Sequence, residues 1–452
     1  MQLASPVSVS EFRARLQALN IGDRFAIAVS GGRDSMALAR LCADYVKSEG
    51  SRVVALIVDH GLRDGSSAEA AQAKTWCEAL GLEARILAWR GPKPQSGVQV
   101  AARAARYFLM AEAANELGVS TILTAHSADD QIETMLMRLA RGAGLSGLAS
   151  MEDETRIAAG AGDPVRLARP LLPFSRDALT ATVKAYDQDY IDDPSNDDQR
   201  YERVRIRRVL STLHEDGGLD RDALLQTAQR LRAEKRRRLI EEEHAFRRMG
   251  GVFTRWGGAS FDVASLIDCG PFRDGAIART VRAVSGADHA PDDSEIATHV
   301  DVAVRKGAAA IGGALFKRSG ARLWVLREPA AILGRAGVPP LAAIENPAGA
   351  PMLWDSRFIF TAEEAISVRP LGEPGLTALG ASAALIEAPV EAILGAPGLF
   401  RRDRLIGAPG LLFREGLRWT ATPLAEERFA GGISRVSPEL TNRRGAHGAG
   451  LS

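Results

Sequence analysis

The stretch "FAIAVSGGRDSMALARLCADYVKSEG", residues 25–50, decides the fold because its pattern changes at a single turn. Residues 25–30 are almost wholly apolar, as a buried parallel strand is, whereas the part after Ser35 has helical spacing and ends at Gly50. The turn between them is Ser30-Gly31-Gly32-Arg33-Asp34-Ser35. Backbone N–H groups and the positive end of a helix converge at such a turn, and glycines let the backbone approach a ligand closely. We therefore expect an anion here, and a phosphate above all.

Asp34 is the informative residue of this turn, because a phosphate-binding loop often carries a lysine there. A carboxylate repels a polyphosphate unless a divalent cation lies between them, and Mg²⁺ commonly binds one carboxylate together with phosphate oxygens. The sequence thus predicts a magnesium ligand at Asp34. A helix-capping role for Asp34 stays open, and Arg33 can point at phosphate or at solvent.

The same alternation continues outward from this turn. Apolar runs at 53–59, 84–89 and 120–125 are separated by segments of helical spacing that each end in glycine. Strand and helix in alternation predict an α/β fold with a doubly wound parallel sheet, in which ligands bind beyond the carboxyl ends of the strands.

The sequence also predicts how the chain divides into domains. We expect a catalytic domain over 1–215, a basic linker helix over 216–250 and one or two small α+β modules over 251–440. The last twelve residues, 441–452, have the composition of a disordered tail.

Composition limits the function classes. The net charge is only +1, so affinity for nucleic acid has to come from local basic runs such as 200–208 and 230–238, which can equally be ordinary solvated helix faces. Three widely spaced cysteines disfavour a disulfide framework or a structural zinc site. No apolar run reaches the roughly 18 residues of a membrane span, and we expect a cytoplasmic protein that does not enter a membrane.

Five more stretches fall at the ends of strands or in the loops that follow. They are "VDHGLR" (58–63), "ARAARY" (102–107), "AHSADDQIET" (125–134), "RGAGLSGL" (141–148) and "DDPSNDDQRYERVRIR" (192–207). Arg103 and Arg106 lie at i, i+3 on one helix face, a spacing suited to a phosphate or a base edge. Asp129 and Asp130 lie in a first helical turn, with Glu133 one turn later on the same side.

The turn at 30–35 resembles the PP-loop, the S-G-G-x-D-S signature of the N-type ATP pyrophosphatases, whose members cleave ATP between the α and β phosphates. With the five further stretches, residues 25 to about 210 resemble the tRNA(Ile)-lysidine synthetase family in motif order. The resemblance implies a PP-loop fold, the substrates ATP and L-lysine, Mg²⁺, and the isoleucine tRNA with a CAU anticodon. Dimers occur in the family, so a homodimer is also expected.

The resemblance and the chemistry together assign roles. Residues Ser30, Gly31, Gly32, Arg33, Asp34 and Ser35, with His60 and His126, are expected to bind ATP and its leaving pyrophosphate. Asp130 is expected to bind the lysine amine and accept a proton, while Arg106 and Arg207 stabilise the adenylate and orient the base. Substrate or tRNA contacts are expected from Arg63, Arg103, Asp129, Glu133, Arg203 and Arg205.

Structural roles remain as alternatives for several of these residues. Asp130 can be a helix N-cap partner, Arg106 and Arg207 can lie on solvated faces, and His126 can be a satisfied core histidine. The chain also departs from the family pattern at Ser127, where a second histidine is usual, and at Val204, where an asparagine is usual. Ser127 can line the pocket but cannot act as a base.

Three other functions compete with this prediction. A tRNA thiolase of the same superfamily would need cysteine pairs, and an amidotransferase-type synthetase would need an ammonia source, neither of which is visible. A non-catalytic RNA-binding protein would have no need to keep both "SGGRDS" and "DDQIET" complete.

Overall fold

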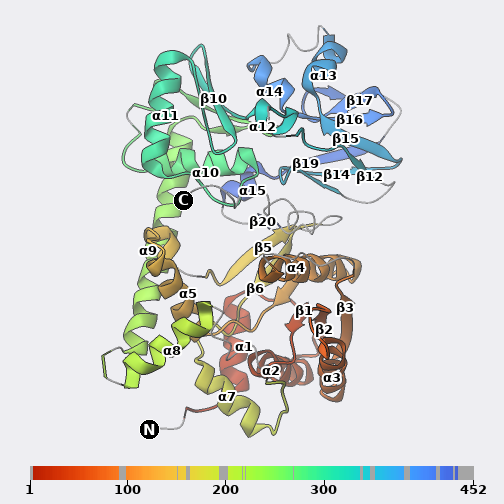
Figure 1. Cartoon of the computed structure of the whole chain (residues 1–452), viewed down its shortest axis with the longest axis vertical. Coiled ribbons are helices and arrows are strands. Elements are labelled where there is room, and N and C mark those ends of the chain that lie inside the picture. Colours follow the sequence, from red (N-terminus) through yellow and green to blue (C-terminus); the bar gives the residue numbers. More distant parts are fainter. Residues whose placement is uncertain are drawn as a thin grey trace. The chain divides into compact units, whose positions relative to one another are not determined.

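The computed structural model describes residues 4–90, 98–149, 151–158, 163–192, 202–215, 217–218, 220–267, 269–335, 339–346, 352–380, 387–413, 418–430 and 433–435. These residues form two compact units, one up to Arg236 and one from Arg237 to Arg435 (Figure 1). The expected disordered tail, 441–452, lies outside the described residues, and so do residues 193–201 of the stretch quoted above as 192–207.

The first unit is built on a sheet in which β5-β6-β4-β1-β2-β3 are neighbours in that order. Its strands are β1 (Arg24–Val29), β2 (Arg52–Asp59), β3 (Glu83–Ala88), β4 (Thr121–Leu123), β5 (Glu154–Ala158) and β6 (Val165–Ala168). Neighbouring strands from β6 to β3 are parallel, and β5 pairs antiparallel with β6 at Ile157–Val165. The predicted doubly wound α/β fold is confirmed.

Helices cover both faces of this sheet (Figure 1). They are α1 (Val9–Ala18), α2 (Arg33–Glu49), α3 (Ser66–Ala79), α4 (Val98–Glu116), α5 (Ala128–Ala140), α6 (Leu145–Leu148), α7 (Arg176–Ala185) and α8 (Glu202–Glu215). Phe25 and Ile27 alternate with Ala26 along β1, so they pack with α1, α2, α3 and α7, whereas Ala26 packs with α4. Each fully buried Phe or Ile side chain contributes about 1.5–3 kcal/mol. This burial fixes where β1 ends and α2 begins.

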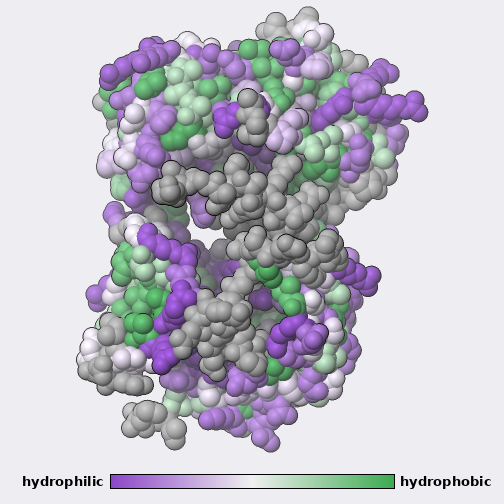
Figure 2. Space-filling model, viewed as in Figure 1, coloured by the Kyte–Doolittle hydropathy of each residue, from purple (hydrophilic) through white to green (hydrophobic). Residues whose placement is uncertain are grey.

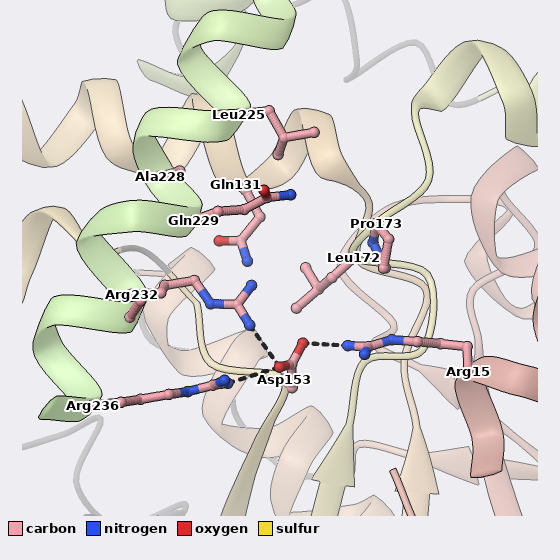
Figure 3. Close-up of a pocket in the computed structure, with 11 residues that line it drawn as sticks. Arg15, Gln131, Asp153, Leu172, Pro173, Leu225, Ala228, Gln229, Arg232 and Arg236 are labelled. Carbon is pink, nitrogen blue, oxygen red and sulfur yellow. Dashed lines mark hydrogen bonds and ion pairs between the residues drawn. The ribbon is translucent and has the colours of Figure 1, made fainter. Parts of the chain in front are cut away.

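The long helix α9 (Arg221–Arg248) begins in the first unit and ends in the second. It lies within the range 216–250 in which the basic linker helix is expected. Its first half is joined to the first unit by the ion pairs of Asp153, which accepts from Arg232 at 2.6 Å, from Arg236 at 2.7 Å and from Arg15 (Figure 3). Burial alone would raise the pKa of Asp153, but these guanidiniums lower it.

The described residues of the second unit form three antiparallel sheets together with several helices. The first sheet has the order β7 (Val252–Phe253), β8 (Ala259–Asp262), β11 (Arg322–Arg327), β10 (Ala314–Ser319) and β9 (Ala308–Ile311). The second has the order β12 (Ile344–Asn346), β15 (Ile366–Pro370), β16 (Pro397–Arg401), β17 (Arg404–Ala408) and β18 (Leu412–Phe413). The third joins β13 (Met352–Trp354), β14 (Phe358–Ala362) and β19 (Trp419–Pro423).

The helices of this unit are α10 (Arg273–Ser285), α11 (Asp293–Lys306), α12 (Pro329–Leu333), α13 (Gly372–Leu379), α14 (Val390–Leu394) and α15 (Ala425–Phe429), and a last strand, β20, spans Ile433–Arg435. Helix α10 is buried along most of its length and packs with Phe261 and Phe316 of the first sheet. Strands and helices thus both occur within the range 251–440, where the sequence predicts α+β modules. Small α+β modules after the linker helix are therefore confirmed.

Some large apolar side chains of the described residues are exposed. Leu139, Val209 and Ile267 are among them, and on the face drawn in Figure 2 apolar residues are scattered among hydrophilic ones. Isolated residues of this kind are normal on a protein surface. Within the described part of the chain, no helix combines the length and apolar character that crossing a membrane requires.

Candidate active site

The turn after β1, residues 30–35, is here called the glycine loop. It is held by Ser35, whose hydroxyl donates to the Gly32 carbonyl at 2.8 Å and accepts from the Ser30 N–H at 3.1 Å. Gly31 has a φ of +82°, which glycine adopts without strain. The loop therefore ends at the first turn of the 17-residue helix α2, where the positive end of the helix dipole favours an anion.

A distant segment closes over Gly31. The N–H of Ile191 donates to the Gly31 carbonyl at 2.9 Å, and residues 32 and 191 form a short parallel bridge. A Cβ on Gly31 would lie 2.5 Å from Cδ1 of Ile191, closer than real atoms approach. Glycine is thus required at this position both by the backbone and by the neighbouring side chain.

Asp34 contacts two guanidiniums. Its Oδ1 accepts from Nε of Arg33 at 2.9 Å, and its Oδ2 lies 3.8 Å from Nε of Arg176. The N-cap residue of α2 is Gly32, and no side chain forms a capping hydrogen bond there. The Asp34 side chain therefore forms these ion pairs and not the helix cap that was considered for it. Arg33 points at this carboxylate.

The motif at 125–134 forms the start of α5. Ser127 is its N-cap residue, is fully buried, and donates its N–H to Oδ2 of Asp130 at 2.9 Å. The side chain of Asp129 is also structural, because its Oδ2 accepts the backbone N–H of Arg176 at 2.7 Å and its Oδ1 pairs with Arg221. The capping role considered for Asp130 is therefore present in the structure, and Ser127 supports it.

Glu133 is the most enclosed carboxylate of the group, with a side chain that is 1% exposed. It binds Nη1 of Arg176 at 2.9 Å, Nε of Arg207 at 2.9 Å and Nε of Arg203 at 3.3 Å. Arg176 in turn lies 3.5 Å from Asp130. Asp34, Asp130 and Glu133, here called the carboxylate cluster, are thus joined through one arginine.

The protonation states at this site follow from burial and charge. Burial lowers the pKa of His126 to about 3, so its ring is neutral at pH 7, and its Nδ1 lies 2.9 Å from the Thr124 hydroxyl. Burial alone would raise the pKa of Asp130, but the charges of Arg176 and Arg203 and the hydrogen bond from the Ser127 N–H help to hold it below its usual range. Asp130 is therefore a carboxylate at neutral pH, well suited to bind an ammonium and a weak acceptor of its proton.

His60 and Arg106 form a second group at the end of β2. Nε2 of His60 lies 3.1 Å from Nη2 of Arg106, which comes from α4, and the His60 ring packs edge-on against Trp89. The structure thus brings together two residues that are 46 positions apart in the chain.

Three more predicted residues have other partners or surroundings. Arg63 pairs with Glu69 at 2.7 Å on the surface, and Arg205 is exposed on α8. Arg103 lies over the ring of Tyr107, and its charge is one of the causes that lower the pKa of His126. The ion pairs given above for the carboxylate cluster do not include these three arginines.

A cavity of about 220 Å³ lies beside the cluster. It is lined by Asp129, Ile132, Glu133, Arg176, Asp177, Arg207, Leu210, Ser211 and Arg221. Three carboxylates, three guanidiniums and two large apolar side chains line it, so it offers partners for charges of both signs and for an alkyl chain.

Gln131 extends the same motif towards α9. Its side-chain amide exchanges two hydrogen bonds with the backbone of Met151, at 2.9 and 2.8 Å, and Asp153 follows two residues later. Figure 3 shows Gln131 and Asp153 lining one cavity of about 240 Å³ together with Arg232 of α9. The start of α5 is therefore connected to the helix that leads to the second unit.

Three residues of the site, Arg176, Ile191 and Arg221, were not predicted from the sequence. Arg176 ends "RPLLPFSR" (169–176), in which Ser175 caps α7 and places the arginine in the first helical turn. The sequence does show an arginine directly after an N-cap serine, which indicates a side chain in the first turn of a helix. It does not show the carboxylate partners of this arginine, because they come from other elements.

The donor set can be compared with what Mg²⁺ requires. Among the described residues, no group of three or more His, Cys, Asp or Glu side chains could hold a metal ion by itself. One carboxylate beside a phosphate-binding turn fits Mg²⁺, because this ion usually takes one or two carboxylates and completes its shell with phosphate oxygens and water. Asp34 meets that description.

Comparison with known proteins gives a consistent result. A family model described as a PP-loop domain matches residues 8–213. The chain is 43% identical over 229 residues to a tRNA(Ile)-lysidine synthase of Bradyrhizobium diazoefficiens, an alignment that covers 50% of this chain and 62% of the relative. It is 35% identical over 342 residues to that of Methylobacterium nodulans (73% and 98% covered) and 32% identical over 413 residues to that of Ruegeria pomeroyi (88% and 90%).

The first of these matches spans about three fifths of the relative's length, whereas the other two extend through both units. The PP-loop domain contains the glycine loop. The alignment with the relative from Ruegeria pomeroyi continues beyond this domain, because it covers 88% of the chain. The chain belongs to the tRNA(Ile)-lysidine synthase family, and residues 8–213 are its PP-loop domain.

Proposed function

We propose that this chain uses ATP to join free L-lysine to C2 of the wobble cytidine in the isoleucine tRNA with a CAU anticodon. The observation that carries the proposal is that Asp34 of the glycine loop and Asp130 of α5 both face Arg176. A phosphate-binding turn and a carboxylate able to bind an amine therefore belong to one site. Membership in the family supports the same reaction. The product, lysidine, would change codon reading from AUG to AUA.

In the first step, the O2 atom of cytidine forms a bond to the α-phosphorus of ATP as the bond to pyrophosphate breaks. The N–H groups of residues 30–35 and the start of α2 hold the β and γ phosphates. Mg²⁺, when bound, neutralises charge on these phosphates, and Asp34 would hold it. Arg106 and Arg207 are proposed to stabilise the adenylate and orient the base, with His60 and His126 beside the nucleotide.

In the second step, the lysine ε-amine forms a bond to C2, and AMP leaves as the C2–O bond breaks. The amine must lose a proton before it attacks, and Asp130 is proposed to bind its ammonium form and to accept that proton. The cavity of about 220 Å³ beside Glu133 is proposed to hold the amino acid, because its carboxylates and guanidiniums match the amines and the carboxylate of lysine.

The tRNA is proposed to contact the basic helices and the second unit. Arg203 and Arg205 lie on α8, and α9 carries the basic run at 230–238. Contacts between such residues and phosphates weaken with added salt. The proposed division is a catalytic domain over 1–215, a linker helix over 216–250 and a tRNA-binding region over 251–440. A cytoplasmic location and a homodimer fit this proposal.

The cysteines argue against sulfur transfer. Cys42, Cys77 and Cys269 are all buried and free, and burial raises the pKa of Cys77 to about 12. Burial raises the pKa of Cys42 and Cys269 as well. A thiolase needs accessible thiolates or a cluster of cysteines, so lysine transfer is the reaction favoured.

The deciding experiment supplies the full chain with labelled lysine, ATP, Mg²⁺ and the CAU-anticodon isoleucine tRNA. We expect one lysine incorporated for each AMP and pyrophosphate released, and no incorporation when the wobble cytidine is replaced by uridine. Sulfur incorporation from a sulfur donor, with none from lysine, would reassign the chain to the thiolases.

A further inference from the structure

Arg176 is held firmly on one side and loosely on the other. Its backbone N–H is bound by Asp129 at 2.7 Å, and its Nη1 is bound by the buried Glu133 at 2.9 Å. Its Nε is 3.8 Å from Asp34, beyond hydrogen-bond distance. The guanidinium thus stays in place if Asp34 moves to another partner.

The position of Arg176 also explains how the site tolerates three acids. Asp34, Asp130 and Glu133 approach from α2 and α5, and like charges at such distances repel one another. The side chain of Arg176 is only 15% exposed, so solvent screens its attraction to these carboxylates less than at the surface. Arg176 and Arg33, at 3.8 and 2.9 Å, both bring a positive charge to Asp34, the carboxylate proposed to bind the divalent cation.

We propose that Arg176 is a positioning residue whose charge faces Asp34, beside the hydrogen bond from Arg33, while the site contains no metal, and that it competes with the divalent cation for this carboxylate. The inference rests on the proposed function, in which Asp34 binds Mg²⁺ beside the nucleotide. When the cation arrives with ATP, Asp34 changes partner while Glu133 keeps Arg176 in place. Arg176 therefore sets how much divalent cation the nucleotide site requires.

The test measures metal binding, not turnover. Mn²⁺ is titrated into the full chain with a non-hydrolysable ATP analogue, and free Mn²⁺ is followed by electron paramagnetic resonance. Arg176→Met removes the competing charge, so we expect half-saturation at about fivefold lower Mn²⁺, the equilibrium equivalent of one partly exposed ion pair. Arg176→Lys restores a cation and should return the value to within about twofold of the unmodified chain.

Two controls make the result specific. Arg40 pairs with Asp44 at 2.9 Å on the same helix as Asp34, and Arg40→Met should leave the Mn²⁺ titration unchanged. If Arg176 acts through Asp34, its substitution should have no further effect in the Asp34→Asn background, as a double-mutant cycle reports.

A second variant, Arg176→Gln, replaces Arg176→Met if the latter unfolds. Glutamine can still donate a hydrogen bond to Glu133, and we expect half-saturation at the same lower Mn²⁺ concentration as for Arg176→Met.

Unchanged or weaker Mn²⁺ binding in Arg176→Met and Arg176→Gln would overturn the inference. Loss of nucleotide binding both with Mn²⁺ and in excess chelator would overturn it too, because Arg176 would then be a direct phosphate ligand. Neither lysine nor tRNA is present, so failure of lysine incorporation would refute the proposed function without changing this result.

Discussion

Replacement of Glu133 by glutamine is the most informative single perturbation of the first unit. The change keeps the shape of the side chain but removes the charge that faces Arg176, Arg203 and Arg207 at 2.9, 3.3 and 2.9 Å. Removing one partner of a buried ion pair typically costs about 3–5 kcal/mol, because the other charge stays buried without compensation. The side chains of Arg203 and Arg207 are 42% and 35% exposed and can turn towards water, so we expect the lower end, about 3 kcal/mol.

Calorimetry of the full chain measures this effect. In a unit of this size, about 1 kcal/mol lowers Tm by about 2–4 °C, so the transition of the first unit should fall by about 6–12 °C. Hydrogen exchange of peptides from α7 and α8 should increase at the same time, because both helices lose their ion pair with residue 133 of α5. Glu78→Gln is the matched control, since Glu78 pairs with Lys74 on the surface of α3 and should cost about 0.5 kcal/mol or less. A Glu133→Gln transition within 1–2 °C of this control would refute the assignment of Glu133 as the central counter-ion.

Three further predictions concern the site and its support. Asp130→Ala should abolish lysine incorporation, whereas Ser127→Ala should keep most of it, because the backbone N–H of Ser127 still donates to Asp130; both are read in the labelled-lysine assay. Gly31→Ala should cost about 1–2 kcal/mol for its left-handed backbone alone, and should weaken nucleotide binding in calorimetric titration because its Cβ would push Ile191 away. The lowered pKa of Asp153 means that its ion pairs contribute stability above its unfolded pKa of about 3.9 and lose it as pH falls through the lower folded value. The Tm difference between the unmodified chain and Asp153→Asn should therefore be full at pH 6 and shrink at pH 3; a constant difference would contradict this.

The sequence by itself determined the elements and the order in which they occur. The apolar run of β1, the glycine loop and the helical spacing of α2 are local patterns, and each is stabilised by hydrogen bonds and burial within a few residues. The capping of α5 by Ser127 is local in the same way. Such features can be predicted because their partners are neighbours in the chain.

Only the tertiary structure decided which charges meet. Glu133 binds Arg176 and Arg207, which lie 43 and 74 positions further along the chain, and Ile191 covers Gly31 from a segment that follows α7. These pairings depend on the order of strands in the sheet and on how α7 and α8 pack beside α5, and nothing in a local pattern specifies either. Because an ion pair depends on distance in space and not on separation in sequence, Arg176 could be recognised only after the chain had been folded around it.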